Sequence, residues 1–326
     1  MIELLAFGEV NPDIVVTGVR ELAFGQSEEI ISMTTTTIGS SVAIMCAGAA
    51  RLGVNVGIVG CVGNDGFGEY MMDRLAERGV DTTFVRTVQG GRTGSSVILV
   101  RADDANDRHI LTDFGVMGDL LASDIKLDEL PELRHLHIGS WFLQTGAVHE
   151  LAPVLADARS RGLTTSVDPN DDPAREWDSY LPAALEHVDV LFCNEPEARG
   201  LARADDRLNA AAALHARMPA GAIVVMKCGA EGAFAWTQDE LIHVAAPKVD
   251  VVDTVGAGDS LTAGFLAARL AGESVADALA LGVASGSMST QASGGVNAQP
   301  ELAVARDLAG TLVTSISSHA SMTDQT

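Results

Sequence analysis

Short apolar runs alternate with longer helical patterns along most of this 326-residue chain. Strands that are apolar along their whole length are buried on both faces, and their alternation with helices is typical of a parallel sheet covered on both sides. We therefore expect an α/β fold with a mainly parallel central sheet, in one large domain with at most a small appendage. Strands are expected at residues 2–7, 57–62, 135–138, 163–167, 188–192 and 222–227, and helices at 42–52, 146–161 and 208–218.

Two stretches interrupt this alternation, and both are rich in β-forming residues. Residues 13–37 contain many Val, Ile and Thr, and residues 92–112 alternate around a turn-like segment at 103–107 that predicts a hairpin. We expect them to form one small β appendage, which is either a lid over the site or an edge extension without a role there. The core would then comprise residues 1–12, 38–91 and 113–314, and the polar residues 315–326 would form a flexible tail.

The acidity of the chain excludes one class of partner. The formal net charge is −23 and no Lys/Arg cluster interrupts it, whereas nucleic-acid-binding proteins need a basic surface that displaces counterions. The four cysteines show no CxxC or Cys/His spacing, so we expect reduced thiols and no zinc site. We see no basic secretory leader and no apolar run of about 20 residues. We expect a cytoplasmic protein that binds neither nucleic acid nor membrane.

The segment from Asp253 to Asp259 carries the clearest chemical signal. Residues 251–252 predict a strand ending at Asp253, Gly256-Ala257-Gly258 predicts a tight turn, and residues 259–270 predict a helix. A glycine turn at a helix N-terminus directs free backbone N–H groups at one point, which suits a phosphoryl group in transfer. By itself, Asp259 in the first turn is more often a cap than a base. The turn also lacks the third glycine of a dinucleotide fingerprint.

The same segment, Asp253-Thr254-Val255-Gly256-Ala257-Gly258-Asp259-Ser260, resembles the second signature of the ribokinase-like (PfkB) carbohydrate kinases. Further matches follow in family order along the chain, at Asn11-Pro12-Asp13, residues 53–68, Gly79-Val80-Asp81, Asp168-Pro169-Asn170, Asn194-Glu195-Pro196-Glu197 and Lys227-Cys228-Gly229 with Gly232. The resemblance implies a ribokinase-like three-layer fold with a small β lid. It also implies ATP-dependent phosphorylation of a hydroxymethyl group on a sugar or sugar-like molecule.

The resemblance assigns roles at the reacting end of the site. Asp259 would accept the proton of the acceptor hydroxyl, and the amides of Gly256, Ala257 and Gly258 would form an anion hole. The residues expected to bind the acceptor are Asn11, Asp13, Gly39 and Ser40.

The resemblance also implies a nucleotide site and a cation site. Asn194, Glu197, Lys227, Gly229 and Gly232 would bind or border ATP, and Glu197 would organise Mg²⁺ through water. The residues expected around a monovalent cation such as K⁺ are Asp253, Val255, Ser289 and Gly294. Gly60 and Gly63 are expected to serve close backbone packing rather than a ligand, and Trp141 is expected in the core.

The chain departs from the family pattern on the acceptor side. Ser40 replaces the second glycine of the family's Gly-Gly motif, and Ile44 stands where an asparagine is usual. An aliphatic group cannot replace a hydrogen-bonding amide, so we do not expect a typical ribokinase or fructokinase acceptor. Asp171-Asp172 follow Asp-Pro-Asn where an aromatic residue and Arg are common, which disfavours a sugar acid.

Three further functions remain open from the sequence. The first is a nucleoside kinase of the same family, with which Ile44 is compatible because a base needs an apolar surface. The second is a non-catalytic sugar or nucleotide sensor, which would have no need of Asp259. The third is a Rossmann oxidoreductase, which the missing glycine disfavours. The sequence does not determine the oligomeric state, but the resemblance makes a homodimer through the β lid one possible assembly, since lids of this family often pair.

Overall fold

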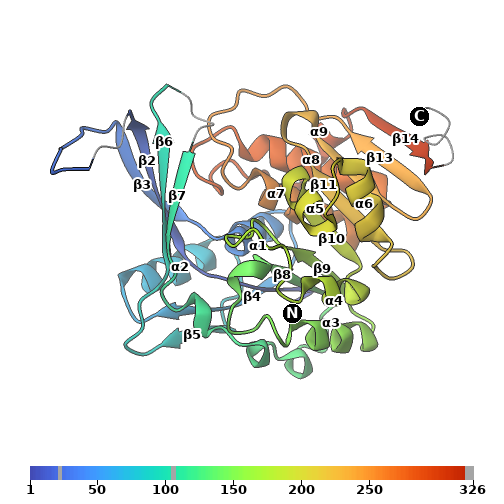
Figure 1. Ribbon diagram of the computed structural model, residues 1–326, viewed down its shortest axis with the longest axis horizontal. Helices are drawn as coiled ribbons and strands as arrows, with labels where there is room; N and C mark the ends of the chain where they lie inside the picture. The colour runs from blue at the N-terminus through green and yellow to red at the C-terminus, as the bar shows by residue number, and fades with distance from the viewer. Residues whose placement is uncertain (21–23, 104–107, 320–326) are drawn as a thin grey trace.

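The computed structural model describes residues 1–20, 24–103 and 108–319 (Figure 1). Its central sheet has ten strands in the order β14-β13-β12-β11-β10-β9-β8-β1-β4-β5. The strands are β1 (Leu4–Phe7), β4 (Val56–Gly63), β5 (Val85–Val88), β8 (His135–Gly139), β9 (Thr164–Asp168), β10 (Val190–Asn194), β11 (Ile223–Lys227), β12 (Ala233–Trp236), β13 (Glu240–Val244) and β14 (Thr314–Ser318). Neighbours from β5 to β11 pair in parallel, and β12 to β14 form an antiparallel edge. The expected parallel α/β core is confirmed.

Helices cover both faces of this sheet. One layer contains α1 (Ser41–Arg51), α2 (Gly66–Glu77), α7 (Ala257–Leu270), α8 (Val275–Ser289) and α9 (Leu302–Ala309). The other contains α3 (Leu151–Ser160), α4 (Leu181–Ala184), α5 (Glu195–Ala202) and α6 (Arg207–His215). Successive side chains of β1 alternate between the layers, with Leu4 and Ala6 in the first core and Leu5 and Phe7 in the second. This double burial explains why the strands are apolar throughout.

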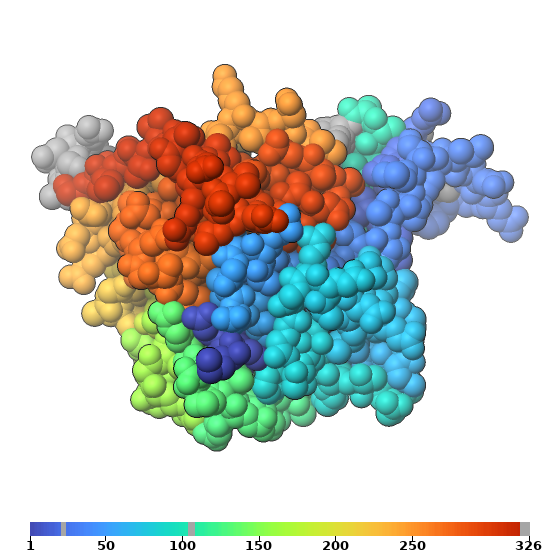
Figure 2. All heavy atoms as spheres, turned by 180° about the vertical axis from the view of Figure 1, so that it is seen from behind, coloured from blue at the N-terminus to red at the C-terminus, as the bar shows by residue number. Residues whose placement is uncertain are grey.

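The expected β appendage is a separate four-stranded sheet that projects from the body (Figures 1 and 2). Its order is β3-β2-β6-β7, from β2 (Pro12–Val19), β3 (Met33–Ile38), β6 (Ser95–Arg101) and β7 (Arg108–Asp113). Most of the predicted turn at 103–107 lies outside the described residues. Val15 and Ile98 on its inner face pack against Val255. The appendage therefore contacts the Asp253–Asp259 segment directly.

Two local expectations were wrong. Residues 251–252 form no strand, and Val251 and Val252 are 56% and 52% exposed. The amides of Val252 and Asp253 instead donate to the carbonyl of Thr290 after α8, so no neighbouring strand is needed. The expected flexible tail begins too early, because β14 pairs with β13. All five residues of β14 are exposed, so this edge strand carries no apolar alternation that would have revealed it.

Two other local features agree with their expectations. Trp141 is fully buried and its indole N–H donates to the carbonyl of Ser179 at 2.8 Å. No helix within the described ranges is long and apolar enough to cross a membrane.

The strand order also marks where a ligand is expected to bind. In the central sheet, β4 and β5 are added on one side of β1, and β8 and the strands after it are added on the other side. The strand order therefore reverses at β1. In open parallel sheets, ligands bind outside the carboxyl ends of the strands, at the point where the order reverses. Residues that follow β1, β8, β9, β10 and β11 therefore converge on one edge.

A glycine at the end of β4 generates a stability prediction. A Cβ on Gly63 would lie 2.5 Å from the carbonyl oxygen of Gly91 and 2.6 Å from the amide nitrogen of Thr93. Because these are backbone atoms, Gly63→Ala should lower the free energy of unfolding by about 1–3 kcal/mol, as overpacking usually does.

The matched control is Gly66→Ala, three residues away, where a Cβ would meet nothing within 4 Å. Urea unfolding followed by circular dichroism compares the two variants. Equal midpoints for both would show that the backbone at Gly63 is not closely packed.

Candidate active site

The start of α7 forms a cradle of unpaired backbone amides. Gly256, at φ 72°, is the N-cap, a left-handed conformation that glycine adopts without strain. The amides of Gly256, Gly258 and Asp259 have no hydrogen-bond partner within the described part of the chain. Ala257, expected to share the anion hole, differs because its amide donates to the carbonyl of Thr254 at 3.3 Å. The free amides and the helix dipole favour an anion at this point.

Asp259 lies in the first turn of α7, half-buried among other acidic groups. Burial raises the pKa of Asp259 to about 8, against the attraction of Lys227, while Asp168, Glu9 and Asp13 raise it further. Its carboxylate has no hydrogen bond to a helix amide, so Asp259 is not the cap of α7. A carboxyl group with a pKa near neutrality, placed beside free amides, is typical of a general base.

Lys227, at the end of β11, is the cation of this edge. Its Nζ donates to Asp168 Oδ2 at 2.7 Å, and both side chains are largely buried. A Cβ on Gly258 would lie 3.4 Å from Lys227 Nζ, so the ammonium group sits against the amide cradle. Burial alone would lower the pKa of Lys227, but Asp168, Glu197 and Asp259 together raise it above its ordinary value. Lys227 therefore stays charged beside the anion site.

Asn194 and Glu197 are joined at the start of α5 by a reciprocal cap. Asn194 Oδ1 accepts from the amide of Glu197 at 2.9 Å, and Glu197 Oε2 accepts from the amide of Asn194 at 2.8 Å. Glu197 is 5% exposed, and burial raises its pKa against the attraction of Lys227. Asn194 therefore caps α5, as its position in the sequence also allowed. The same pair of hydrogen bonds holds the carboxylate of Glu197 near Lys227.

Gly229 and Gly232 shape the turn that follows Lys227. Both adopt positive φ, at 55° and 96°, and the amide of Cys228 donates to the carbonyl of Gly232 at 2.9 Å. A Cβ on Gly232 would collide with the backbone of Val244 and Ala246. This tight turn leaves the edge beside Lys227 free of side chains from either glycine.

Asp253, expected near a monovalent cation, uses both of its carboxylate oxygens to join its own loop to the loop that contains Gly294. Its Oδ1 accepts from the amide of Val255 and its Oδ2 from the amide of Gly294, both at 2.9 Å. Ser289, expected in the same cation site, is fully buried and donates to the carbonyl of Gly286. Among the residues that the structure describes, no group of three or more His, Cys, Asp or Glu side chains is arranged for a metal ion.

The predicted acceptor residues come together after β1 and before α1. Asn11 and Asp13 are 2% and 6% exposed, and the carboxylate of Asp13 lies so close to Gly39 that no Cβ could fit there. Burial raises the pKa of Asp13 to about 7, with Glu9 adding to the rise. Ser40 is less available, because its hydroxyl caps α1 at the amide of Ala43 and donates to the carbonyl of Glu9.

Ile44, which stands at the family's asparagine position, packs against the glycine turn. It is 2% exposed, and its side chain packs where a Cβ on Gly256 or Gly295 would lie. The side chain of Ile44 therefore fills the space between the glycine turn and Gly295. Ile44 gives no evidence for or against a ribose-type or nucleoside acceptor.

Sequence reasoning gave no role to four polar residues of this edge, which are Glu9, Ser140, Gln144 and Asn170. Glu9 follows β1, Ser140 follows β8 and Asn170 follows β9, and hydrogen bonds connect all four. Of these four residues, only Asn170 belongs to a family match, which is Asp168-Pro169-Asn170. Strand order, which no single motif records, is the signal that brings them together.

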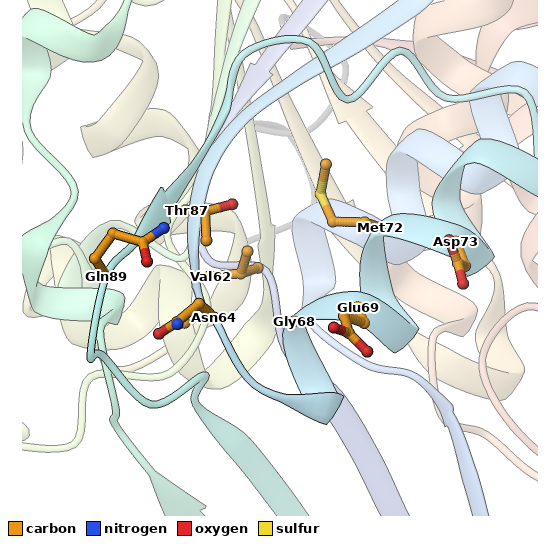
Figure 3. Close-up of a pocket in the computed structure, with 9 residues that line it drawn as sticks. Val62, Asn64, Gly68, Glu69, Met72, Asp73, Thr87 and Gln89 are labelled. Atoms are coloured by element: carbon orange, nitrogen blue, oxygen red, sulfur yellow. The ribbon is translucent and has the colours of Figure 1, made fainter.

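A separate hollow of about 640 Å³ lies near the other edge of the sheet (Figure 3). It is lined by the end of β4, by α2 and by the segment around β5, with Glu69, Asp73, Asn64 and Gln89 among its polar residues. None of the predicted site residues lines this hollow.

Comparisons with known proteins agree with the geometry. The model of the pfkB family of carbohydrate kinases matches residues 1–302. The chain is 31% identical to the ATP-dependent ribose-1-phosphate kinase of Halopiger xanaduensis, over 94% of this chain and 97% of the relative. It is 30% identical to a fructokinase of Klebsiella pneumoniae, over 80% and 88% of the two chains. The crystal structure of a putative ribokinase II from E. coli in complex with ATP and Mg²⁺ matches with a TM-score of 0.82 at 25% identity, covering 94% and 99% of the two chains.

The expected fold and the family motifs therefore lead to the same conclusion. This chain belongs to the pfkB family of carbohydrate kinases.

Proposed function

We propose that this kinase transfers the γ-phosphoryl group of ATP to a hydroxymethyl group of a sugar or sugar-like acceptor, with Asp259 as the general base. The observation that carries the proposal is the position of Asp259, half-buried and flanked by the free amides of Gly256 and Gly258. The names of the relatives, a ribose-1-phosphate kinase and a fructokinase, support a sugar acceptor.

The phosphate half of the site fits ATP bound with Mg²⁺. Free amides and the ammonium group of Lys227 supply positive charge. Glu197 supplies carboxylate oxygens, and so does Asp168 through its Oδ1, which has no hydrogen-bond partner among the residues that the structure describes. Mg²⁺ prefers such oxygens, in part through water. Bound there, Mg²⁺ would neutralise charge on the phosphate oxygens. The match to a structure that contains ATP and Mg²⁺ supports both ligands.

In the proposed reaction, the acceptor hydroxyl forms a bond to the γ-phosphorus as its proton passes to Asp259. The bond between that phosphorus and the bridging oxygen breaks, and ADP leaves with its electron pair. The amides of Gly256 and Gly258 would stabilise the charge on the transferring group. Lys227, held in place by Asp168, would face the same oxygens.

A nucleoside kinase and a non-catalytic sensor have less support. Ile44 no longer supports a nucleoside acceptor in particular, because its side chain packs against Gly256 and Gly295. A sensor would not need a carboxyl group with a pKa raised to about 8 in the first turn of α7. A monovalent cation would use the Val255 carbonyl and the loop fixed by Asp253, without the side chain of Ser289.

The substitution Asp259→Asn tests the base. The variant should fold and bind ATP but lose about 10²–10⁴-fold in kcat, since proton transfer to a positioned base contributes roughly that factor. ADP release measured with a panel of sugars gives kcat, and calorimetry gives ATP affinity. The control is Asp277→Asn, a first-turn aspartate of α8 that lies outside the site. Near-normal turnover of Asp259→Asn would refute the assignment.

The raised pKa values predict an unusual pH profile. Asp259 and Asp13 have pKa values of about 8 and about 7, above those of ordinary aspartates, because both are buried and face other carboxylates. The base must be ionised, so kcat/KM for the acceptor should fall as pH drops below these values. Initial rates at varied acceptor concentration and saturating MgATP, taken from pH 5 to 9, give this pH dependence of kcat/KM. A flat profile down to pH 5 would contradict the assignment.

We also propose that the lid forms a homodimer. Ile14, Val97 and Leu111 lie side by side across β2, β6 and β7, on the face opposite Val15 and Ile98. Leu111 is 50% exposed, so this apolar row is not fully covered within one chain. A second lid would cover it.

Light scattering after size exclusion tests this assembly. Leu111→Lys should shift the wild-type dimer toward a monomer, because it places a charge in the apolar row. The control Ile316→Lys alters a residue of similar exposure on β14 and should leave the dimer intact. A monomeric wild-type protein would rule out the proposed dimer.

A further inference from the structure

The pleat of the β appendage determines which of its side chains face the active site. Successive side chains of a strand point to opposite faces, and residues paired across neighbouring strands share a face. Val15 of β2 pairs with Ile98 of β6, which pairs with Ile110 of β7 (Figure 1). Val15 and Ile98 pack against Val255, so this row faces the segment that carries Asp259. Arg108, two residues before Ile110 on β7, therefore lies on the same inner face.

The inner face also carries a residue expected to bind the acceptor. Asp13 lies two residues before Val15 on β2 and pairs with Ser96, which pairs with Thr112 of β7. The hydroxyl oxygens of Ser96 and Thr112 are 3.2 Å apart, which agrees with side chains on one face. The inner face thus extends from the carboxylate of Asp13, across a pair of hydroxyls, to the guanidinium group of Arg108.

The part of the inner face that belongs to β7 is open. Val15 and Ile98 are 2% and 3% exposed, whereas Ile110 in the same row is 49% exposed. All six residues of β7 are exposed, Arg108 among them. A molecule held by Asp13 can therefore extend along the appendage toward Arg108 without displacing packed side chains.

Arg108 supplies a positive charge that is not paired within the chain. Arg92, at the base of the same appendage, donates two hydrogen bonds to the carboxylate of Asp113, at 2.8 and 2.7 Å. Within residues 1–20, 24–103 and 108–319, Arg108 forms neither a hydrogen bond nor an ion pair. Burial raises the pKa of Asp13, and the charge of Arg108 acts against that rise. The guanidinium group is therefore close enough to act on the expected acceptor residue.

The register of the strands places Arg108 away from the reacting end. Arg108 pairs with Val100, four residues along β6 from Ser96, which is the partner of Asp13. At about 3.4 Å per residue, the two rows are roughly 14 Å apart along the strands. The long side chain of arginine covers part of this distance. Its guanidinium group therefore lies near the far end of a small acceptor that Asp13 holds.

The chemistry of arginine restricts what binds at that end. A guanidinium group is always charged, and its planar fork of N–H groups matches the oxygens of a phosphate or a carboxylate. The phosphoryl group in transfer already faces other positive groups, which are Lys227 and the free amides of Gly256 and Gly258. The partner that fits Arg108 is thus an anionic group on the acceptor itself.

We propose that Arg108 is a specificity-determining residue that binds an anionic group, a phosphate or a carboxylate, at the end of the acceptor remote from the reacting hydroxyl. The acceptor is then an anionic sugar rather than a free one. The name of one relative, a ribose-1-phosphate kinase, agrees with a phosphate at that position. This inference rests on the proposed function, because it names the acceptor class of that reaction.

The test compares wild type with Arg108→Gln on matched pairs of acceptors that each keep a free hydroxymethyl group. The pairs are ribose with ribose 1-phosphate, fructose with fructose 6-phosphate, and glucose with gluconate. Wild type should give at least a tenfold higher kcat/KM for the anionic member of one pair. Arg108→Gln should remove about tenfold or more of that advantage through KM, since charged hydrogen bonds are lost, while KM for ATP stays within twofold.

Two further variants separate charge at this position from charge elsewhere on the appendage. Arg108→Lys keeps the charge without the fork, so its kcat/KM should lie between those of wild type and Arg108→Gln. Arg101→Gln is the control, because it removes the same charge from β6 on the opposite face, next to Val100, which pairs with Arg108. Its preference between the members of each pair should equal that of wild type.

Calorimetric titration of the same acceptors without nucleotide separates this inference from the proposed function. If no acceptor stimulates ADP release, but an anionic sugar binds wild type at least tenfold more tightly than Arg108→Gln, the reaction is wrong and the anion site stands. The pair that shows the preference decides between phosphate and carboxylate. Equal or better use of every free sugar by wild type would overturn the inference and leave the kinase reaction intact.

A second result would also overturn it. If Arg108→Gln lowers kcat/KM equally for both members of a pair and only shifts the acid limb of the pH profile, Arg108 acts through the ionisation of Asp13. It would then not contact an anionic group of the acceptor.

Discussion

The site depends on one buried cation shared among several carboxylates. Lys227 contacts Asp168 directly and also acts on Glu197 and Asp259. The strands β9 and β11 of the parallel sheet and the helices α5 and α7 supply these groups, so the fold sets their mutual distances. Buried charges are tolerated only when paired, and removing one partner leaves the others uncompensated. The positive charge of Lys227 thus offsets part of the negative charge of these carboxylates, which would otherwise repel the phosphates of ATP.

The two halves of the site differ in how much the sequence predicts. The phosphate half is mostly local, because Gly256, Gly258 and Asp259 are adjacent in the chain and their chemistry follows from a glycine turn that enters a helix. The core strands were equally predictable, since burial on both faces makes them apolar throughout. From the sequence alone, Asp259 could have been a helix cap. Only the fold shows that it is half-buried and that Lys227, Asp168 and Glu9 act on its pKa.

The acceptor half could not be predicted in the same way. Glu9, Ser140 and Asn170 come from three strands that are far apart in the chain, and only strand order brings them together. Ser40 and Ile44 occupy family positions, yet one hydroxyl is used as a helix cap and one aliphatic group packs behind Gly256. Position in a motif indicates where a residue lies along the chain. It does not indicate whether the side chain points toward the ligand.

Asp253 has a mechanical consequence beyond its place in a signature. Its two oxygens tie the amide of Val255, one residue before the glycine turn, to the amide of Gly294. Gly294 in turn lies against Thr37 on β3, whose hydroxyl is 3.1 Å from where a Cβ on Gly294 would be. Val255 also packs directly against Val15 and Ile98 of the lid. Displacement of the β appendage would therefore be transmitted by two routes to the amides at the start of α7, so the appendage and the glycine turn form a single mechanical unit.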